Sequence, residues 1–149
     1  MRAVVTRVKS ASVAIDGEIR GRIGAGFLIL LGVAPGDTPE DCTKLADKIL
    51  GLRVFRDEND KMNRSLRDAE GSVLVVSQFT LFADCAHGRR PGFFGAAAPE
   101  KAIPLYEQFL SECEKRGFPP QHGEFGAYMQ VESCNDGPVT LILDTEEWK

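Results

Sequence analysis

The sequence lacks the apolar segments of an exported or membrane-spanning protein. Its longest apolar run, residues 27–33, is far shorter than the roughly 20 residues that cross a bilayer. The opening MRAVVTRVKSASV also has no apolar core of a signal peptide. We therefore expect a cytoplasmic protein without membrane partners. A length of 149 residues suits a single domain over residues 1–149 and excludes a two-domain enzyme.

Side chains that bind metals are also scarce. The chain has only 2 histidines, and its 4 cysteines include no CxxC pair. Cysteines spaced this widely form no compact zinc cluster, and disulfides are not favoured without an export signal. We therefore expect no metal, no cofactor, and free thiols buried as small apolar groups. The cysteines are Cys42, Cys85, Cys113 and Cys134.

The chain has no excess of positive charge. It carries 18 Lys and Arg against 22 Asp and Glu, which gives a formal charge of -4. A protein of this charge is not expected to bind long stretches of nucleic-acid backbone, and we expect no DNA partner. Residues 1–99 hold 14 basic and 12 acidic side chains, whereas residues 100–149 hold 4 and 10. The first two-thirds can therefore still contact a few phosphates.

Apolar patterning predicts several strands. Residues 2–9 and 11–15 are rich in β-branched side chains, and Asp16-Gly17 follows them as a hairpin turn. Residues 26–33 and 72–79 are continuously apolar. Such runs are typical of strands that are covered on both faces, so a layer must lie on each side of them.

Two helices are predicted as well. Thr38 suits an N-cap with Pro39 at the first helical position, and Pro99 opens a second helix that Gly117 ends. Residues at helical spacing mark one buried face of each helix. These residues are Cys42, Leu45, Ala46 and Ile49 in the first helix, and Ile103, Tyr106, Leu110 and Cys113 in the second.

The remaining segments complete the expected topology. Residues 127–133 alternate, Asn135-Asp136-Gly137 suggests a tight turn, and residues 138–144 return as a strand. A short strand at 52–55 and a long loop at 83–98 are also expected. The order of elements predicts the α/β fold class, as a three-layer α/β/β single domain with mixed sheets, two helices and a C-terminal β-hairpin.

Candidate chemistry begins where the second apolar strand ends. Ser77-Gln78-Phe79-Thr80-Leu81 places two hydroxyls and an amide at a point where backbone N–H groups become available. Adjacent N–H donors can stabilise an oxyanion, with a contribution that reaches roughly 3 to 4 kcal/mol per donor. In the alternative interpretation, Ser77 and Thr80 only satisfy local backbone groups at a strand end.

The following loop offers two other kinds of site. Thr80, Asp84 and His87 supply a hydroxyl, a carboxylate and an imidazole, and Cys85 with His87 supplies a thiol pair. Neighbouring residues on one loop seldom converge on one reaction centre, so both hydrolase arrangements stay as alternatives. The nearby arginines of Gly88-Arg89-Arg90-Pro91 suit a clamp for phosphate or carboxylate, or a solvated surface run.

Two motifs in combination point to a family. SQFTL at 77–81 and GPVT at 137–140 resemble the two signature motifs of the D-aminoacyl-tRNA deacylases. GRRP at 88–91 and the apolar segment GRIGAGFLILLGV extend the resemblance over essentially the whole chain. It implies a three-layer α/β/β homodimer that hydrolyses the ester between a D-amino acid, or a wrongly attached glycine, and the terminal adenosine of tRNA. The partners implied are tRNA and a second copy of the chain.

The resemblance also implies residue roles. The strand end would line the pocket and donate backbone hydrogen bonds to the ester, and a Gly-Pro segment with a cis bond would enter the partner subunit's pocket to exclude L-amino acids. Apart from the resemblance, the charge of residues 1–99 makes the arginines of the loop the first candidates for phosphate contacts. These residues are Ser77, Gln78, Phe79 and Thr80; Gly137, Pro138, Val139 and Thr140; and Arg89 and Arg90.

The mechanism implied by the resemblance uses no side chain as nucleophile or base. Instead, the 2′-hydroxyl of the terminal ribose helps to activate the attacking water. A Thr80 nucleophile is the second interpretation, and a non-enzymatic dimeric RNA-binding module is the third. The family often has Asp at the position of Tyr128 and Ser at the position of Gly92, so contacts there are not predicted. A related animal-specific deacylase alters both motifs, whereas this chain keeps them.

Overall fold

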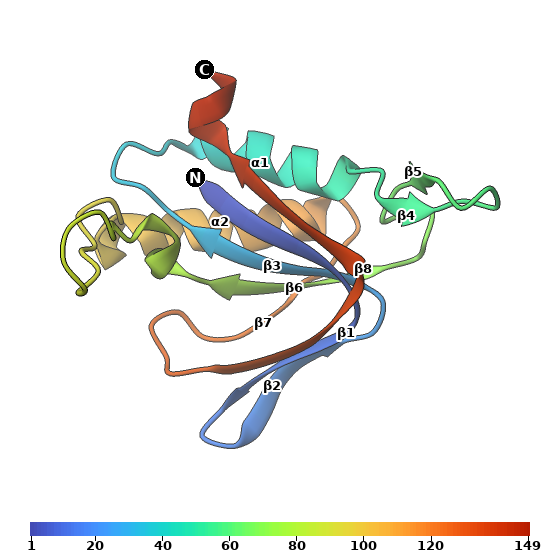
Figure 1. The fold of residues 1–149 in the computed structure, drawn as a ribbon, viewed down its shortest axis with the longest axis horizontal. Coiled ribbons are helices and arrows are strands. Elements are labelled where there is room, and N and C mark those ends of the chain that lie inside the picture. The colour runs from blue at the N-terminus through green and yellow to red at the C-terminus, as the bar shows by residue number, and fades with distance from the viewer.

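The computed structural model describes residues 1–149 and places two helices on one side of a strongly bent sheet (Figure 1). The helices are α1 (Pro39–Gly51) and α2 (Pro99–Lys115), with short 3-10 helices η1 (Phe79–Phe82) and η2 (Thr145–Trp148). The strands are β1 (Arg2–Ile15), β2 (Glu18–Ile23), β3 (Gly26–Gly32), β4 (Phe55–Arg56), β5 (Met62–Arg64), β6 (Ser72–Ser77), β7 (Gln121–His122) and β8 (Gln130–Asp144). No helix is long and apolar enough to cross a membrane.

The long strand β1 organises the sheet. It pairs antiparallel with β3 over its first half, with β2 over its second half, and with β8 along both halves. In contrast, β3, β6 and β7 are parallel to one another. The sheet is therefore mixed, as predicted, and the parallel pair β3 and β6 ends at one common edge.

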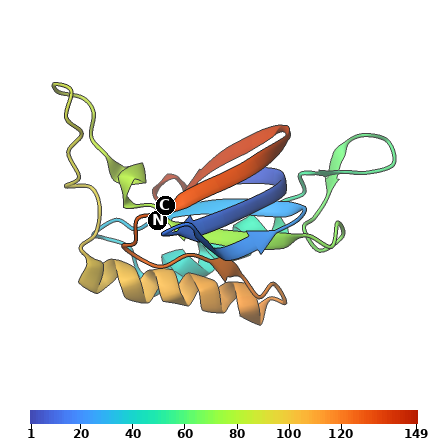
Figure 2. The ribbon, with the colours of Figure 1, turned by 90° about the horizontal axis from the view of Figure 1, so that it is seen from below.

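Both faces of β3 and β6 are buried, which confirms the interpretation of their continuous apolar sequences. A core of 23 buried residues, including Phe27 and Ile29, fills the space between the sheet and the helices. A second core of 7 buried residues lies on the opposite face, where Val13 of β1 and Ile23 of β2 pack over Leu74. Helices, central strands and the folded-back half of β1 with β2 form the three predicted layers (Figure 2).

The helices begin where the sequence predicts. Thr38 and Asp41 form a reciprocal capping box at the start of α1, and all four predicted core residues of α1 are buried. The buried face of α2 is turned slightly from the prediction, because Ala102, Leu105 and Phe109 are buried whereas Ile103 and Leu110 are only half-buried. Because α2 packs on both the sheet and α1, its buried face is wider than the one that helical spacing predicts.

The predicted C-terminal hairpin is wrong. β8 is one strand of 15 residues, and both of its halves pair with β1 in the same antiparallel direction. Asn135 lies opposite Val8 and Thr140 lies opposite Thr6, so the residues between them form a bulge. The Asn135 side chain closes this bulge, accepting from the Val139 N–H at 3.1 Å and donating to the Thr140 hydroxyl at 3.0 Å. The turn-forming residues therefore widen a strand without reversing it.

Other boundaries also differ from the sequence predictions. The two predicted strands at 2–9 and 11–15 form the single strand β1, and the strand at 72–79 ends at Ser77 because the chain turns into η1. The strand at 52–55 shortens to β4, which pairs with the unpredicted β5. All four cysteines are free, but only two are buried, since one exposed thiol lies on the long loop and one on the outer strand β8. The exposed cysteines are Cys85 and Cys134.

A buried carboxylate joins the two helices and gives a pH-dependent prediction. Glu112 of α2 accepts hydrogen bonds from Arg116 and from the Thr43 hydroxyl of α1. The bond from Arg116 holds the pKa of Glu112 below its ordinary value of 4.5. A carboxylate with a lowered folded-state pKa stabilises the protein above pH 4.5, and this stabilisation is lost as the pH falls through the folded-state pKa.

Replacing Glu112 with glutamine should therefore lower the free energy of unfolding by about 1 kcal/mol at neutral pH. The difference from the unmodified protein should shrink as the pH falls through the lowered folded-state pKa of Glu112, because both proteins then carry a neutral side chain. Urea unfolding at neutral and at acidic pH measures both values. Glu107→Gln on the exposed side of α2 is the matched control and should have no such pH dependence. Equal differences at the two pH values would contradict the assignment.

Candidate functional site

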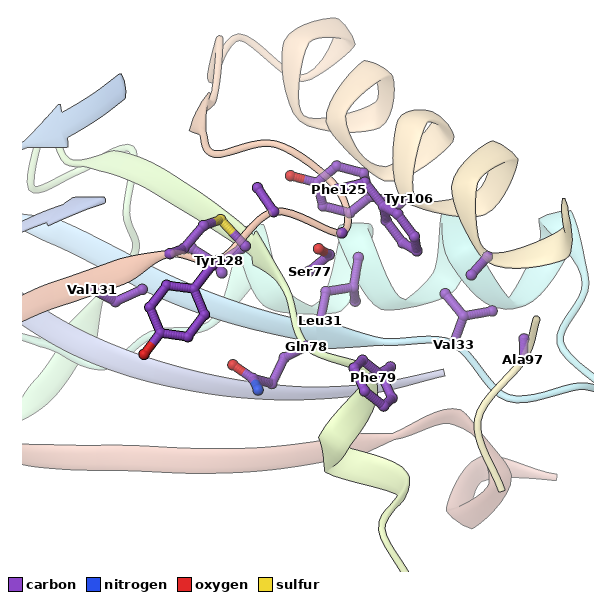
Figure 3. Close-up of a pocket in the computed structure, with 15 residues that line it drawn as sticks. Leu31, Val33, Ser77, Gln78, Phe79, Ala97, Tyr106, Phe125, Tyr128 and Val131 are labelled. Atoms are coloured by element: carbon purple, nitrogen blue, oxygen red, sulfur yellow. The ribbon is translucent and has the colours of Figure 1, made fainter. Parts of the chain in front are cut away.

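A pocket opens at the carboxyl ends of β3 and β6 (Figure 3). Open α/β sheets commonly bind ligands outside the carboxyl ends of their parallel strands. The cavity has a volume of about 230 Å³, and 12 of its 15 lining residues are hydrophobic. The walls are the strand ends with Leu31 and Ser77, the first half of α2 with Tyr106, and the segment 125–129. The pocket therefore suits a small, largely apolar group.

The predicted strand-end motif lies at this pocket. Ser77, Gln78 and Phe79 belong to its wall, whereas the exposed Thr80 lies just beyond it. The Gln78 N–H donates to the Leu31 carbonyl at 2.7 Å, which holds the exits of the two strands together. The Gln78 side-chain amide donates to the Thr80 hydroxyl. The Thr80 hydroxyl is therefore hydrogen-bonded to an amide, and no side chain that could act as a base contacts it.

The short helix η1 presents backbone amides at the pocket mouth. Its first internal hydrogen bond runs from the Leu81 N–H to the Gln78 carbonyl at 3.2 Å. The amides of Phe79 and Thr80 precede this bond, and first-turn amides have no acceptor within their own helix. Arg2 fixes the helix, since its guanidinium donates to the Leu81 carbonyl at 2.7 Å. These two amides are therefore held in place beside the cavity.

Two tyrosines give the pocket its only side-chain hydroxyls besides that of Ser77. The Tyr106 hydroxyl donates to the Val75 carbonyl at 3.2 Å, and its ring centroid lies 5.9 Å from that of Phe125. Burial raises the pKa of Tyr106 to about 12, so its hydroxyl stays protonated. Tyr128 lies on the rim with 86% of its surface exposed. The aromatic rings offer flat apolar faces to a ligand.

No acid or base lines the pocket. None of the lining residues is a histidine, cysteine, aspartate, glutamate, lysine or arginine. Cys85 and His87 are exposed on the loop outside it, and neither makes a side-chain hydrogen bond. Asp84 uses its carboxylate to accept from the Ala86 N–H at 2.9 Å, so it does not orient His87 or Thr80. The structure also contains no cluster of three or more His, Cys, Asp or Glu that could hold a metal.

The arginines of the GRRP segment lie on the exposed loop that follows η1. Arg89 and Arg90 form no hydrogen bond or ion pair within the chain, so their guanidinium groups are available to a partner. Asp84 and Gly92 exchange two backbone hydrogen bonds, of 2.7 and 2.9 Å, that close the base of the loop. An added side chain at Gly92 would meet no atom closer than 3.8 Å, so the serine common in the family would also fit there. Figure 2 shows the loop reaching away from the body of the protein.

The Gly-Pro segment lies elsewhere. Gly137 and Pro138, joined by a cis bond, lie in the bulge of β8 beside the β4 and β5 hairpin. The buried Arg7 supports them, because its Nε donates to the Asp136 carbonyl at 3.0 Å and its Nη1 donates to the Val54 carbonyl. Pro138 and Thr140 are exposed, and Val139 is half-buried.

The strand register shows how far apart the two motifs lie. Arg2 of β1 faces Gly32 at the end of β3, whereas Arg7 faces Phe27 near its start. Five residues of extended strand correspond to roughly 17 Å. The loop after η1 and the β4 and β5 hairpin also lie at opposite ends of the molecule in both views (Figures 1 and 2). Within one chain, SQFTL and GPVT therefore do not form one pocket.

Sequence reasoning missed most of the pocket wall. The sequence predicts Tyr106 only as a core residue of a helix, places Met129 on one face of an alternating strand and assigns Phe125 no role, yet all three line the cavity. The available signal was positional, since two parallel apolar strands were expected to end together and ligands bind at such ends. The spacing of residues along the chain does not indicate which distant segment covers the ends of β3 and β6.

Comparisons with known proteins agree with the motifs. The family model for D-Tyr-tRNA(Tyr) deacylase matches residues 4–144. A D-aminoacyl-tRNA deacylase of Herpetosiphon aurantiacus is 55% identical over 149 residues, which cover 100% of this chain and 97% of that protein. One of Thermus aquaticus is 55% identical over 147 residues, which cover 99% of this chain and 97% of that protein.

A solved structure gives the same result for the fold. The protein described as c-Myc DNA Unwinding Element Binding Protein superposes with a TM-score of 0.91 at 44% sequence identity. The match covers 97% of this chain and 98% of the other. The α/β architecture with two helices is thus shared over the full length. With the family model and the curated relatives, these matches show that the chain belongs to the D-aminoacyl-tRNA deacylase family of enzymes.

Proposed function

We propose that the pocket at the ends of β3 and β6 binds the aminoacylated terminal adenosine of tRNA, and that the protein releases tRNA and a free D-amino acid or glycine. The observation that carries this proposal is the position of SQFTL, whose backbone amides border an apolar cavity without an acid or base. An aminoacyl ester needs space for a side chain and donors for its carbonyl oxygen, and this cavity offers both.

Hydrolysis at this site would proceed by attack of water on the ester carbonyl carbon. The carbonyl oxygen becomes an oxyanion that accepts hydrogen bonds from the Phe79 and Thr80 amides. The bond to the ribose oxygen then breaks, and that oxygen takes a proton as the tRNA leaves. The neighbouring 2′-hydroxyl of the ribose assists the attacking water, since no side chain at the cavity can act as a base.

Chiral selection would require two subunits. Gly137 and Pro138 lie roughly 17 Å from the strand ends of their own chain and are exposed, so they are available to the pocket of a second copy. There, their carbonyl groups would occupy the space of an L side chain and leave room for glycine and D-amino acids. Steric rejection of L side chains gives this selectivity with one set of contacts, whereas positive recognition would need a pocket that fits every D side chain.

The proposal is tested with matched D-tyrosyl-tRNA, L-tyrosyl-tRNA and free tyrosine esters. We expect rapid release of tyrosine from the D-charged tRNA alone. Hydrolysis of free esters without regard to chirality, with D-tyrosyl-tRNA left intact, would contradict the assignment. Inhibition by thiol reagents would favour a Cys85 and His87 hydrolase, and stoichiometric RNA binding without turnover would favour a binding module.

Replacing Thr80 with alanine should leave at least about one-tenth of the kcat/KM for D-tyrosyl-tRNA, because only one exposed hydrogen bond is lost. Removal of a true nucleophile costs on the order of a millionfold. Thr80→Ser is the matched control, since it keeps a hydroxyl. Activity in the serine variant together with complete loss in a folded, substrate-binding alanine variant would establish the Thr80 nucleophile instead.

The complementary test changes the substrate. A D-aminoacyl-tRNA that ends in 2′-deoxyadenosine should be hydrolysed much more slowly than the ribose form, while its binding is retained. Undiminished hydrolysis would exclude the ribose-assisted mechanism. The same dependence explains why an RNA end, and not a DNA end, is the proposed substrate.

A further inference from the structure

The loop after η1 carries an aromatic side chain that has no role in the folded chain. Phe94 is 97% exposed, the highest value among the exposed large apolar residues of the protein. A fully exposed phenylalanine contributes nothing to the core, and such side chains commonly mark a surface that binds a partner. It lies two residues after Gly92, which pairs with Asp84 to close the base of the long loop.

This aromatic residue is held next to the pocket. Phe93 packs edge-to-face on Phe79 of the pocket wall, with ring centroids 5.1 Å apart. Three residues after Phe94 the chain is anchored again, since the Ala97 N–H donates to the Val33 carbonyl at 2.9 Å. Phe94 lies between these two anchors. Phe94 is therefore the direct chain neighbour of a residue that packs on the pocket wall, and its own side chain is left exposed.

The charge of the same loop is positive, in contrast to the chain as a whole. The loop of residues 83–98 contains His87, Arg89 and Arg90 against the single carboxylate of Asp84, although the whole chain has a formal charge of -4. Neither arginine is neutralised by an acidic side chain of the protein. Guanidinium groups bind phosphates, and exposed aromatic rings stack on unpaired bases.

We propose that Phe94, Arg89 and Arg90 bind the unpaired nucleotides that precede the terminal adenosine of tRNA, with a base stacked on Phe94 and phosphates held by the two arginines. This inference rests on the proposed function, because it takes the terminal adenosine to lie in the adjacent pocket. A single-stranded RNA end fits the surface better than a second copy of the acidic chain, since the loop offers cations together with an aromatic face.

The test compares two stable ligands in which D-tyrosine is joined by an amide bond. One is D-tyrosyl-3′-aminoadenosine, and the other is a four-nucleotide RNA that ends in the same group. The unmodified protein should bind the RNA more tightly than the nucleoside. Phe94→Ala should weaken RNA binding about tenfold and leave nucleoside binding unchanged. Phe94→Trp should keep the affinity for RNA.

Arginine variants report on the phosphates. Replacing both Arg89 and Arg90 with alanine should lower the salt dependence of RNA binding by about one phosphate contact for each residue.

Ile19→Ala on β2 is the matched control for Phe94→Ala, because it also removes an exposed apolar side chain. Ile19 is 48% exposed and lies on another part of the protein. Ile19→Ala should change neither the affinity for the RNA nor the affinity for the nucleoside.

Each outcome decides between the two proposals. If neither ligand binds the unmodified protein, the proposed function fails. If the nucleoside binds and the RNA gains nothing, or if Phe94→Ala weakens both ligands equally, only the inference about the loop fails. Sedimentation of Phe94→Ala completes the test, since conversion of a dimer to monomers would show that the ring contacts a second copy instead.

Discussion

Replacing Gly26 with alanine is expected to lower the free energy of unfolding by about 3 kcal/mol. Gly26 begins β3 with a φ of +155°, and a Cβ there would lie 1.9 Å from the Ser72 carbonyl oxygen of β6. Backbone cannot yield as a flexible side chain does. The alanine must therefore separate β3 from β6 at the point where their parallel pairing begins.

The neighbouring Gly24 provides a matched control for this experiment. A Cβ at Gly24 would meet nothing within 4 Å, so Gly24→Ala should change stability little. Urea unfolding of the two variants gives both values. We also expect Gly26→Ala to weaken binding of D-tyrosyl-3′-aminoadenosine, because the same two strands carry the pocket at their other ends. Equal stabilities of the two variants would show that the strand pair tolerates the extra methyl group.

Replacing Gly137 with alanine is expected to reduce the preference for D-tyrosyl-tRNA over L-tyrosyl-tRNA by at least about tenfold. Gly137 has a φ of +133°, and a Cβ there would lie 2.6 Å from a guanidinium nitrogen of Arg7. Arg7 is 2% exposed and holds the carbonyls of Asp136 and Val54, so it has little space to retreat. The bulge would shift instead, and with it the carbonyl groups proposed to exclude L side chains.

Gly17→Ala controls for backbone strain alone. Gly17 also has a positive φ, of +79°, but a Cβ there would meet nothing within 4 Å. The ratio of kcat/KM for the two substrates should be unchanged in this variant. Gel filtration of both variants shows whether the subunits still associate. If Gly137→Ala keeps its full preference while its dimer is intact, the bulge does not select chirality.

The elements predicted most accurately are those specified by local chemistry. Residues 26–33 and the core of 72–79 could be assigned because a continuous apolar run excludes water-facing positions, and α1 because Thr38 and Pro39 fix its start. The Asn135 segment was mistaken for a hairpin turn because the same residues suit a bulge, and only pairing with β1 distinguishes the two. Local sequence does not encode that pairing.

Local chemistry also predicts only part of the candidate site. Ser77 to Phe79 could be proposed as candidate residues because strand ends free their backbone groups, and the structure places these three residues in the pocket wall. The covering segment with Phe125 and Tyr128 could not, because it reaches the pocket through contacts with α2 and the sheet that are distant in sequence. Tyr106 was hidden by its double role, since the same ring packs in the core and faces the cavity.

The absence of carboxylates, imidazoles, thiols and basic side chains from the pocket has a consequence for how this enzyme tolerates mutation. On the proposed mechanism, the groups that act on the ester are main-chain amides and a hydroxyl of the substrate, and among substitutions only proline at position 79 or 80 would delete one of these amides. Other substitutions can only displace the amides, through residues such as Arg2 that hold η1 in place. Inactivating changes should therefore concentrate at positions that set the path of the backbone.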